Sequence, residues 1–378
     1  MNILMMVSWY TKKGQDKLEA GVFHYEQSMD LNQYCNMAIY YPFDTDMEDG
    51  FSSEEEWGLQ TYRSPYRPHA FFKNRKFMDE AMEKIIKDFK PDIIHAHVGS
   101  SAGYYAVRYS KKYNIPMVIT EHTPIEISGV DKPGINHYFS KVAFRQSKAN
   151  ICVSKDSQQK LAQIYKDCRF DVIYNGIILP DYNMGCRNYY KDGYLNIVIV
   201  AVLYDLEIKG LKYLLQAIKN LKDKGEKVYL HHIGGGQYLD YFINLAKELG
   251  IEDVVTFYGR CERKQLYEIV SEMDFFVSAS LMECSGVSVQ EAMLLGKPVL
   301  GTNSGGVDSL VPQQAGHIVE KASAKALEEG ILYMKDNLDA YDRDSIKQYA
   351  YDSFEIDHIS KKYLKLYESV LRGDAKDE

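Results

Sequence analysis

A chain of 378 residues is long enough for two domains, each with its own hydrophobic core. Hydrophobic residues make up 46% of the chain and charged residues 26%, which excludes extended disorder outside the termini. A net charge of −8 argues against general nucleic-acid binding.

The first half of the chain alternates short apolar runs with amphipathic stretches. The apolar runs predict strands at residues 2–7, 37–41, 92–95, 116–120, 150–153 and 171–174. The amphipathic stretches predict helices near residues 23–34, 79–89, 103–113 and 138–147. Strands that alternate with helices predict a parallel sheet.

Two connections in this half have open interpretations. Residues 8–22 form a loop that contains Gly14 and Gly21. The two glycines either let this loop approach a ligand closely or have no functional role. Residues 62–77 interleave arginine and lysine with aromatic side chains. That patch either rests on an anionic membrane and receives a lipid-linked acceptor, or packs on its own domain, which we favour.

Other polar groups here fit structural roles better than metal binding. Asp44-Thr-Asp46 has the D-x-D form of some metal sites, but we expect it on a solvated acidic loop. His95 and His97 end a strand on one face by period two, and two histidines are too few for a metal site. His122 follows the next strand and falls at the same edge.

The second half repeats the alternating pattern after an aperiodic linker at residues 177–193. Strands are predicted at residues 196–203, 228–233 and 254–258, and in a run ending at 277; helices are predicted at 211–222, 238–249 and 287–295. Two doubly wound α/β domains follow, with ligands expected at the carboxyl ends of the strands. We place the domains at residues 1–180 and 181–355, with a final helix at 356–378.

Residues 278–306 carry the most informative chemistry. Glu283 lies just before a predicted helix start, where free N–H groups and the helix dipole suit a phosphate. Glu291 follows two turns later, where its carboxylate can accept paired hydroxyls such as those of a ribose. Lys209 precedes another helix; alone it fits a solvated helix start, but here it can face the same phosphates. The run 234–236 of three glycines fits a tight turn or a phosphate contact equally well.

This segment resembles the retaining glycosyltransferases of family 4, which have the GT-B fold. The matching string is E-x7-E from Glu283 to Glu291, then Gly-Lys-Pro-Val at 296–299 and Gly-Gly at 305–306. The resemblance implies two Rossmann-like domains facing a central cleft, the first for the acceptor and the second for a nucleotide sugar. It also implies that the last helix crosses back to the first domain.

The resemblance further implies roles for individual residues. Glu283 would bind hydroxyls of the donor sugar, Lys209 the diphosphate, and His122 the transferred sugar. Glu291 would bind the ribose, and the remaining donor contacts would be Gly21, Arg260, Cys261, Cys284, Ser285, Gly286 and Val287. Val202 stands where family members usually carry an arginine, and Arg260, Arg263 or Lys264 are candidates to compensate.

We therefore expect a retaining enzyme that moves a sugar from a UDP- or GDP-linked donor to an acceptor hydroxyl of a glycan or lipid. Glycolipid, capsule or cell-wall polysaccharide synthesis is the expected setting, with no cofactor and no metal ion. The alternatives are a GT-B phosphorylase, a nucleotide-sugar epimerase, or a non-catalytic two-domain sugar-binding protein. An oxidoreductase is disfavoured because no G-x-G-x-x-G follows the first strand.

The cysteines and the chain start bear on location. Six cysteines without C-x-x-C spacing predict neither a zinc knuckle nor a disulfide framework, which fits a reducing cytoplasm. The opening residues lack the features of a signal peptide, and no apolar run approaches the roughly 20 residues that span a bilayer. We expect a cytoplasmic protein, at most peripheral at the inner face of a membrane.

Overall fold

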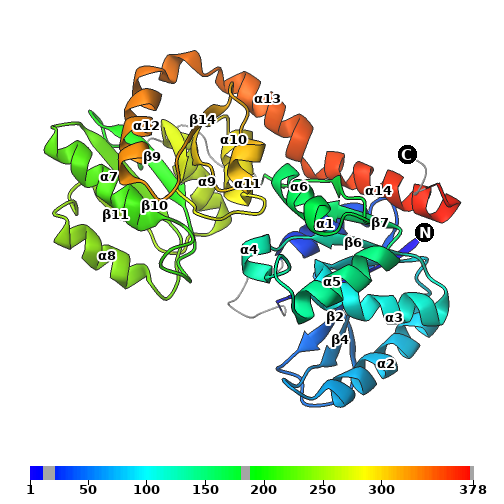
Figure 1. The fold of residues 1–378 in the computed structure, drawn as a ribbon. Coiled ribbons are helices and arrows are strands. Elements are labelled where there is room, and N and C mark those ends of the chain that lie inside the picture. Colours follow the sequence, from blue (N-terminus) through cyan, green and yellow to red (C-terminus); the bar gives the residue numbers. More distant parts are fainter. Residues whose placement is uncertain (12–21, 180–187, 375–378) are drawn as a thin grey trace. The chain divides into compact units, whose positions relative to one another are not determined.

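The computed structural model describes residues 1–11, 22–179 and 188–374. The chain forms two α/β units: unit 1 is Met1–Gly176 with Glu355–Glu378, and unit 2 is Ile177–Phe354 (Figure 1). The two divisions of the chain fall close to the expected boundaries after residues 180 and 355. Within the described ranges, no helix combines the length and apolarity needed to cross a membrane.

Unit 1 is built on an eight-stranded sheet in the order β3-β4-β2-β1-β5-β6-β7-β8. Its strands are β1 (Asn2–Met6), β2 (Asn36–Asp44), β3 (Ser52–Glu56), β4 (Leu59–Pro65), β5 (Ile93–His97), β6 (Met117–Glu121), β7 (Ala149–Cys152) and β8 (Asp171–Val172). Neighbouring strands are parallel, as predicted, except for the antiparallel β3–β4 hairpin.

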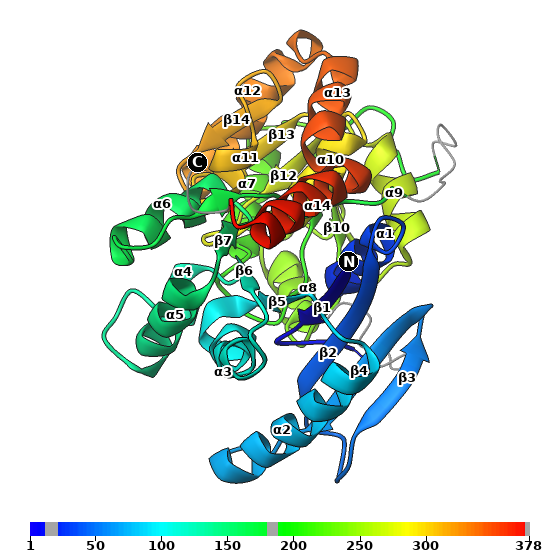
Figure 2. The same cartoon turned by 90° about the vertical axis from the view of Figure 1, so that its right-hand side faces the viewer.

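Helices cover both faces of this sheet. They are α1 (Val22–Leu31), α2 (Phe71–Asp88), a π-helix (Val98–Gly103), α3 (Tyr104–Tyr113), α4 (Ile125–Ser128), α5 (Ile135–Gln146), α6 (Lys155–Ile164) and α14 (Ile356–Arg372). Side chains of β1 alternate between the faces because successive Cβ atoms point to opposite sides of a strand. Leu4 and Met6 pack with residues of α2, α3 and α5, whereas Ile3 and Met5 pack with residues of α1 and α14. Figure 2 shows α14 and α1 together beside the sheet.

The acidic segment after β2 differs from the prediction. Asp44 and Glu56 are buried, and both bind the guanidinium of Arg63 in β4, at 3.1 and 2.7 Å. The expected solvated loop was wrong for these two carboxylates, because the strand that supplies their partner forms a hairpin with β3. The predicted basic and aromatic patch is likewise divided between buried Arg63 and an exposed helix start at Phe71, earlier than the expected residue 79.

Unit 2 has a six-stranded, all-parallel sheet in the order β11-β10-β9-β12-β13-β14. Its strands are β9 (Leu195–Val200), β10 (Val228–Ile233), β11 (Val255–Phe257), β12 (Phe275–Ser278), β13 (Val299–Thr302) and β14 (Gly316–Val319). Its helices are α7 (Leu211–Asp223), α8 (Leu239–Glu248), α9 (Arg263–Glu272), α10 (Val287–Leu294), α11 (Gly306–Leu310), α12 (Ala324–Asp336), a short 3-10 turn (Leu338–Ala340) and α13 (Arg343–Phe354). The two-domain doubly wound architecture is as predicted.

Candidate active site

The predicted donor residues of unit 2 lie where the strand order of its sheet reverses. Chain order runs outward from β9 through β10 to β11 on one side, and from β12 through β13 to β14 on the other. At such a point the loops after the two central strands diverge and leave a crevice for a ligand. Lys209 follows β9 and Glu283 follows β12, so both belong to this edge.

Gly210 brings these two loops together. It has φ +61° at the start of α7, and a Cβ there would lie 1.9 Å from the carbonyl oxygen of Ala279. The N–H of Leu281 also donates to the carbonyl of Ile208 at 2.8 Å. Only glycine permits this backbone approach, and the approach sets Lys209 beside the loop that carries Glu283.

Lys209 and Glu283 form an ion pair. Lys209 Nζ donates to Glu283 Oε2 at 2.7 Å, with side chains 32% and 20% exposed. Two of the three residues predicted to be catalytic thus meet in unit 2. The ammonium neutralises the carboxylate and keeps a localised positive charge at the helix start.

The start of α10 also takes the form that anion binding requires. Gly286 has φ +61° and precedes the helix, while Val287 and Ser288 are its first residues, whose N–H groups have no acceptor within the helix. Cys284 and Ser285 are buried under this turn. A Cβ on Gly306 would come within 2.7 Å of Cys284 backbone atoms. The absence of this Cβ lets the loop after β13 lie against the loop that carries Cys284.

Glu291 lies in α10 with partners from the neighbouring helix α9. Its Oε1 accepts a hydrogen bond from Tyr267 Oη at 2.6 Å and lies 3.5 Å from a terminal nitrogen of Arg263. The Arg263 Nε in turn donates to Tyr267 Oη at 2.8 Å. Burial, with the carboxylate beside it, raises the pKa of Tyr267. Of the three cations expected to compensate for Val202, Arg263 is thus held beside Glu291.

The glycines at 234–236 have a structural explanation. A Cβ on Gly234 would meet the carbonyl oxygen of Ala201 at 2.0 Å, and one on Gly236 that of Leu203 at 2.4 Å. Both close contacts are with the segment after β9, which favours the tight-turn interpretation. Arg260 is exposed, and Cys261 is half-buried in the next loop along the edge.

His122, the third predicted catalytic residue, lies in unit 1 directly after β6. Its Nε2 is 2.7 Å from Nδ1 of His97, and burial lowers the pKa of His122 to about 3. The buried Glu121 carboxylate organises the surrounding loops by accepting from the N–H groups of Gly99, His122 and Thr123. Gly21, the predicted donor contact in the first loop, lies outside the described residues.

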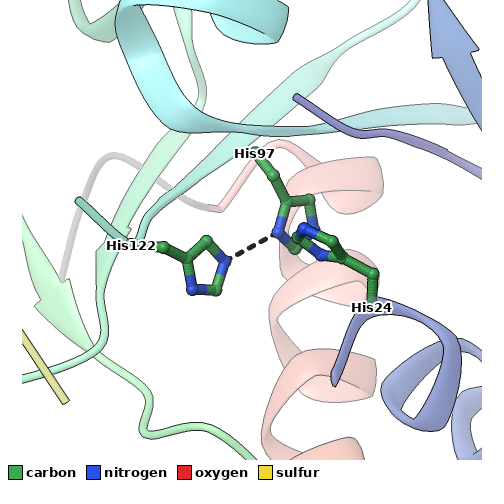
Figure 3. Close-up of side chains that lie close together, drawn as sticks. All are labelled: His24, His97 and His122. Carbon is green, nitrogen blue, oxygen red and sulfur yellow. Dashed lines mark hydrogen bonds between the residues drawn. The ribbon is translucent and has the colours of Figure 1, made fainter. Parts of the chain in front are cut away.

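The two histidines of β5 share a face, as predicted, with ring centroids 4.4 Å apart. His95 is satisfied on both nitrogens, by Tyr367 Oη at 2.7 Å and Thr120 Oγ1 at 2.8 Å, so it is a packed strand end. His97 instead meets His122 and, from α1, His24 (Figure 3). His24 was not predicted from the sequence, because nothing in the pattern of its helix indicated that this side chain would lie near the ends of β5 and β6.

Comparisons with known proteins identify the family of this chain. The model of the family described as Glycosyltransferase Family 4 matches residues 37–179, and that described as Glycosyl transferases group 1 matches residues 191–353. The chain belongs to the family 4 glycosyltransferases. As a member of that family it is a transferase of glycosyl groups.

Two curated members of this kind are similar over much of the chain. The alpha-monoglucosyldiacylglycerol synthase of Streptococcus pneumoniae is 25% identical over 279 residues, which are 68% of this chain and 62% of that synthase. The match therefore spans less than two thirds of that relative. The N-acetyl-alpha-D-glucosaminyl L-malate synthase of Bacillus anthracis is 25% identical over 299 residues, covering 75% of this chain and 76% of that protein.

Solved structures share the fold over the whole glycosyltransferase chain. Sucrose-phosphate synthase from Thermosynechococcus elongatus has a TM-score of 0.81 at 18% identity, covering 99% of this chain and 100% of that one. Anabaena HepE, solved in complex with UDP and glucose, has a TM-score of 0.75 at 19% identity, with 98% and 100% covered. The fold of this family 4 member is GT-B, as expected.

Proposed function

We propose that this glycosyltransferase moves a hexosyl group from a UDP- or GDP-linked donor to an acceptor hydroxyl, with retention of the anomeric configuration. The observation that carries the proposal is the Lys209–Glu283 pair beside the amino end of α10. Negative charge grows on the diphosphate as the sugar leaves, and the Lys209 ammonium together with the first N–H groups of α10 stabilises it more in the transition state than before.

Within this proposal each side chain has one task. Glu283 binds hydroxyls of the donor sugar while Lys209 turns toward the diphosphate. Glu291, oriented by Tyr267, accepts the ribose hydroxyls, and the loops of Arg260–Cys261 and Cys284–Val287 contact the base and the phosphates. Among the described side chains at this edge, none is placed as a nucleophile, so the departing phosphate takes the acceptor proton. No cofactor or metal ion takes part.

For His122 we propose a contact with the transferred sugar, as the family resemblance implies. Its low pKa means that a neutral imidazole, and not a cation, makes the contact. A neutral ring can donate to or accept from a sugar hydroxyl, depending on its tautomer. Such a hydrogen bond orients the sugar without placing a positive charge beside it.

The decisive experiment is a donor screen followed by product analysis. UDP, GDP and ADP sugars are added to the full chain, and the donor is identified by the largest rise in melting temperature. Transfer to a model acceptor is then followed by NMR of the new anomeric centre. An inverted product contradicts retention, sugar phosphate formed only with inorganic phosphate indicates a phosphorylase, and a shift with free sugars alone indicates a binding protein.

We further propose a lipid-linked acceptor in glycolipid or cell-wall synthesis, reached through peripheral membrane contact at the start of α2. Phe71 and Phe72 are 48% and 83% exposed, and Lys73, Arg75 and Lys76 follow them in the same helix. Apolar rings that insert at an interface, beside cations that meet anionic headgroups, suit such a contact. The similar protein of Streptococcus pneumoniae is an alpha-monoglucosyldiacylglycerol synthase, which supports a glycolipid product.

Vesicle sedimentation tests this contact. The full chain should sediment with vesicles that contain phosphatidylglycerol and much less with pure phosphatidylcholine. A Phe71→Ser/Phe72→Ser variant should lose most of this binding, whereas Tyr351→Ser, which changes another exposed aromatic ring, should retain it. Equal sedimentation of both variants would contradict the membrane role of α2.

A further inference from the structure

Three histidines of unit 1 converge at the point where the strand order of its own sheet reverses. β1 and β5 are neighbours there, with β2 and β6 on their outer sides. His97 ends β5, His122 follows β6, and His24 comes from α1, the helix after β1. Figure 3 shows the three imidazoles side by side, and one ring nitrogen from each lies within 4.8 Å of the others.

The hydrogen bonding of these rings is incomplete. His97 Nδ1 and His122 Nε2 share one hydrogen bond of 2.7 Å. Both nitrogens of His24, Nε2 of His97 and Nδ1 of His122 are buried without a partner among the described residues. One of these two rings donates the shared proton. The accepting ring, being neutral, then carries its own N–H on its second nitrogen, and the donating ring has a lone pair on its second nitrogen. Both second nitrogens are buried and unpaired. An unpaired buried polar atom is costly, so His24, which is unpaired on both nitrogens, would gain most from an occupant of the cluster.

The surroundings limit what that occupant can be. His24 and His97 have no exposed surface, and the rings of Phe23 and Trp9 lie 4.0 and 5.6 Å from His24. A single ion needs only converging lone pairs, and half-buried His122 links the cluster to the surface.

The spacing of the ring nitrogens suits a cation. At about 2.0–2.1 Å per Zn–N bond, two nitrogens on one tetrahedral ion lie roughly 3.3 Å apart. The observed separations, from 2.7 Å up to at most 4.8 Å, bracket that value.

The backbone supplies a further sign that this cluster is constrained. Val98, directly after His97, has φ +73°, a conformation that a β-branched residue rarely adopts. Ser8 Oγ donates to the carbonyl of His97 at 2.6 Å and Glu121 accepts from Gly99, which hold the turn in place. Strain of this kind persists where a site requires it.

We propose that His24, His97 and His122 form a transition-metal site that takes Zn²⁺ or a similar ion favoured by imidazole. Three histidines with one position left open are a known zinc arrangement. Binding replaces the His97–His122 hydrogen bond and ties α1 to the ends of β5 and β6. The site lies within unit 1 and includes His122, for which a sugar contact is proposed above; the measurements of metal binding below do not depend on that contact.

Direct metal binding to the untagged full chain tests the proposal. After chelator treatment and incubation with Zn²⁺, elemental analysis should find about one ion per chain. His24→Phe and His97→Gln should each lose that ion, whereas His232→Phe, a buried histidine of unit 2, should retain it. At a hundredfold excess over the dissociation constant, Zn²⁺ should raise the melting temperature of unit 1 by roughly 5–10 °C.

Co²⁺ gives an independent readout because Trp9 lies beside the cluster, with ring centroids 5.6 Å from His24 and 6.4 Å from His122. In a Trp57→Phe background, only Trp9 remains to fluoresce, and Co²⁺ should quench it unless His24 is replaced. No bound ion in the parent chain, or equal binding and quenching after His24→Phe, would overturn the proposal. Folding of His24→Phe is checked by its far-UV circular dichroism, and His97→Gln provides the second variant.

Discussion

We expect the Lys209–Glu283 pair to contribute more to the proposed chemistry than to stability. Both side chains are partly exposed, and ion pairs of that kind stabilise a fold by only about 0–1 kcal/mol. A lysine held 2.7 Å from a carboxylate at the edge where the strand order reverses is therefore better explained by a ligand. Removing it should affect turnover and leave the fold intact.

Lys209→Ala is expected to lower turnover by roughly a hundredfold, because one charge-stabilising donor is typically worth that much in the transition state. The melting temperature should change by only a few degrees. Lys212→Ala is the matched control, since Lys212 lies in the same segment and pairs with Glu207. Near-normal turnover of Lys209→Ala in a steady-state assay would contradict the assignment.

Tyr267→Phe tests the support of Glu291. The variant removes the 2.6 Å hydrogen bond to Glu291 but keeps the ring and the nearby Arg263. A hydrogen bond of this type contributes about 1 kcal/mol or more, so the KM for the donor should rise severalfold. The kcat should change little, because the carboxylate binds the ribose equally before and during transfer. A fall in kcat with unchanged KM would exclude this role.

Buried histidines of unit 2 predict a pH dependence of stability. Burial lowers the pKa of His231 and of His232 to about 4, whereas an unfolded histidine titrates near 6.5. Between these values the unfolded chain binds more protons, so the free energy of unfolding falls as pH falls from 6.5 toward 4. For each of these two histidines, the free energy of unfolding should fall by roughly 2 kcal/mol between pH 7 and pH 5.

Urea unfolding at pH 7 and pH 5, followed by far-UV circular dichroism, measures this effect. His232→Phe should reduce the pH-dependent loss by about one histidine's share, because phenylalanine does not titrate. A variant whose loss equals that of the parent chain would show that His232 is not held neutral.

At the scale of elements, a single backbone contact joins the loops of the candidate donor site. Gly210 ends the loop after β9, and the absence of its Cβ allows the loop after β12 to lie against it. The start of α7 therefore lies against the loop that leads from β12 toward α10. The motif residues depend on this contact although Gly210 itself carries no chemistry.

Gly210→Ala should destabilise unit 2 by at least about 3 kcal/mol, since it adds a clash with the carbonyl of Ala279 to the strain of φ +61°. Gly225→Ala is the matched control: Gly225 also has a positive φ, +80°, but nothing lies within 4 Å of its added Cβ. It should cost only about 1 kcal/mol. Equal losses in thermal unfolding would contradict the close approach.

At the scale of the whole molecule, the two units differ in continuity. Unit 2 is one uninterrupted stretch, whereas unit 1 needs α14 from the far end of the chain. Ile359, Tyr363 and Tyr367 of α14 are buried in the core beside β1 and α1, and Tyr367 also bonds to His95. Burial of two such tyrosines contributes roughly 3–6 kcal/mol, a large share of the total stability of a domain.

Expression of fragments tests this difference. Residues 177–354 should fold alone and melt cooperatively, because they contain a complete core. Residues 1–176 should not fold until the segment 355–378 is supplied as a peptide or fused to them. Cooperative melting of residues 1–176 by themselves would contradict the role of α14.

Several elements could be predicted because local pattern determines them. The strands β1, β9 and β10 lie close to the predicted runs, since each is a continuous apolar segment typical of a parallel sheet. The hairpin of β3 and β4 could not be predicted, because Ser52–Glu56 is acidic and carries no strand signal. The burial of Glu56 at its end depends on Arg63, a partner that only tertiary contact identifies.

The same division holds for the candidate site. The spacing from Glu283 to Glu291 along loop and helix is local, so the sequence alone determined it, together with the glycines that begin and end α10. Tyr267 beside Glu291, and His24 beside His97 and His122, come from other helices. Only the tertiary structure decided their positions, because it brings distant segments of the chain together. Contacts between side chains of different elements depend on how those elements pack, and no periodic pattern in the sequence encodes them.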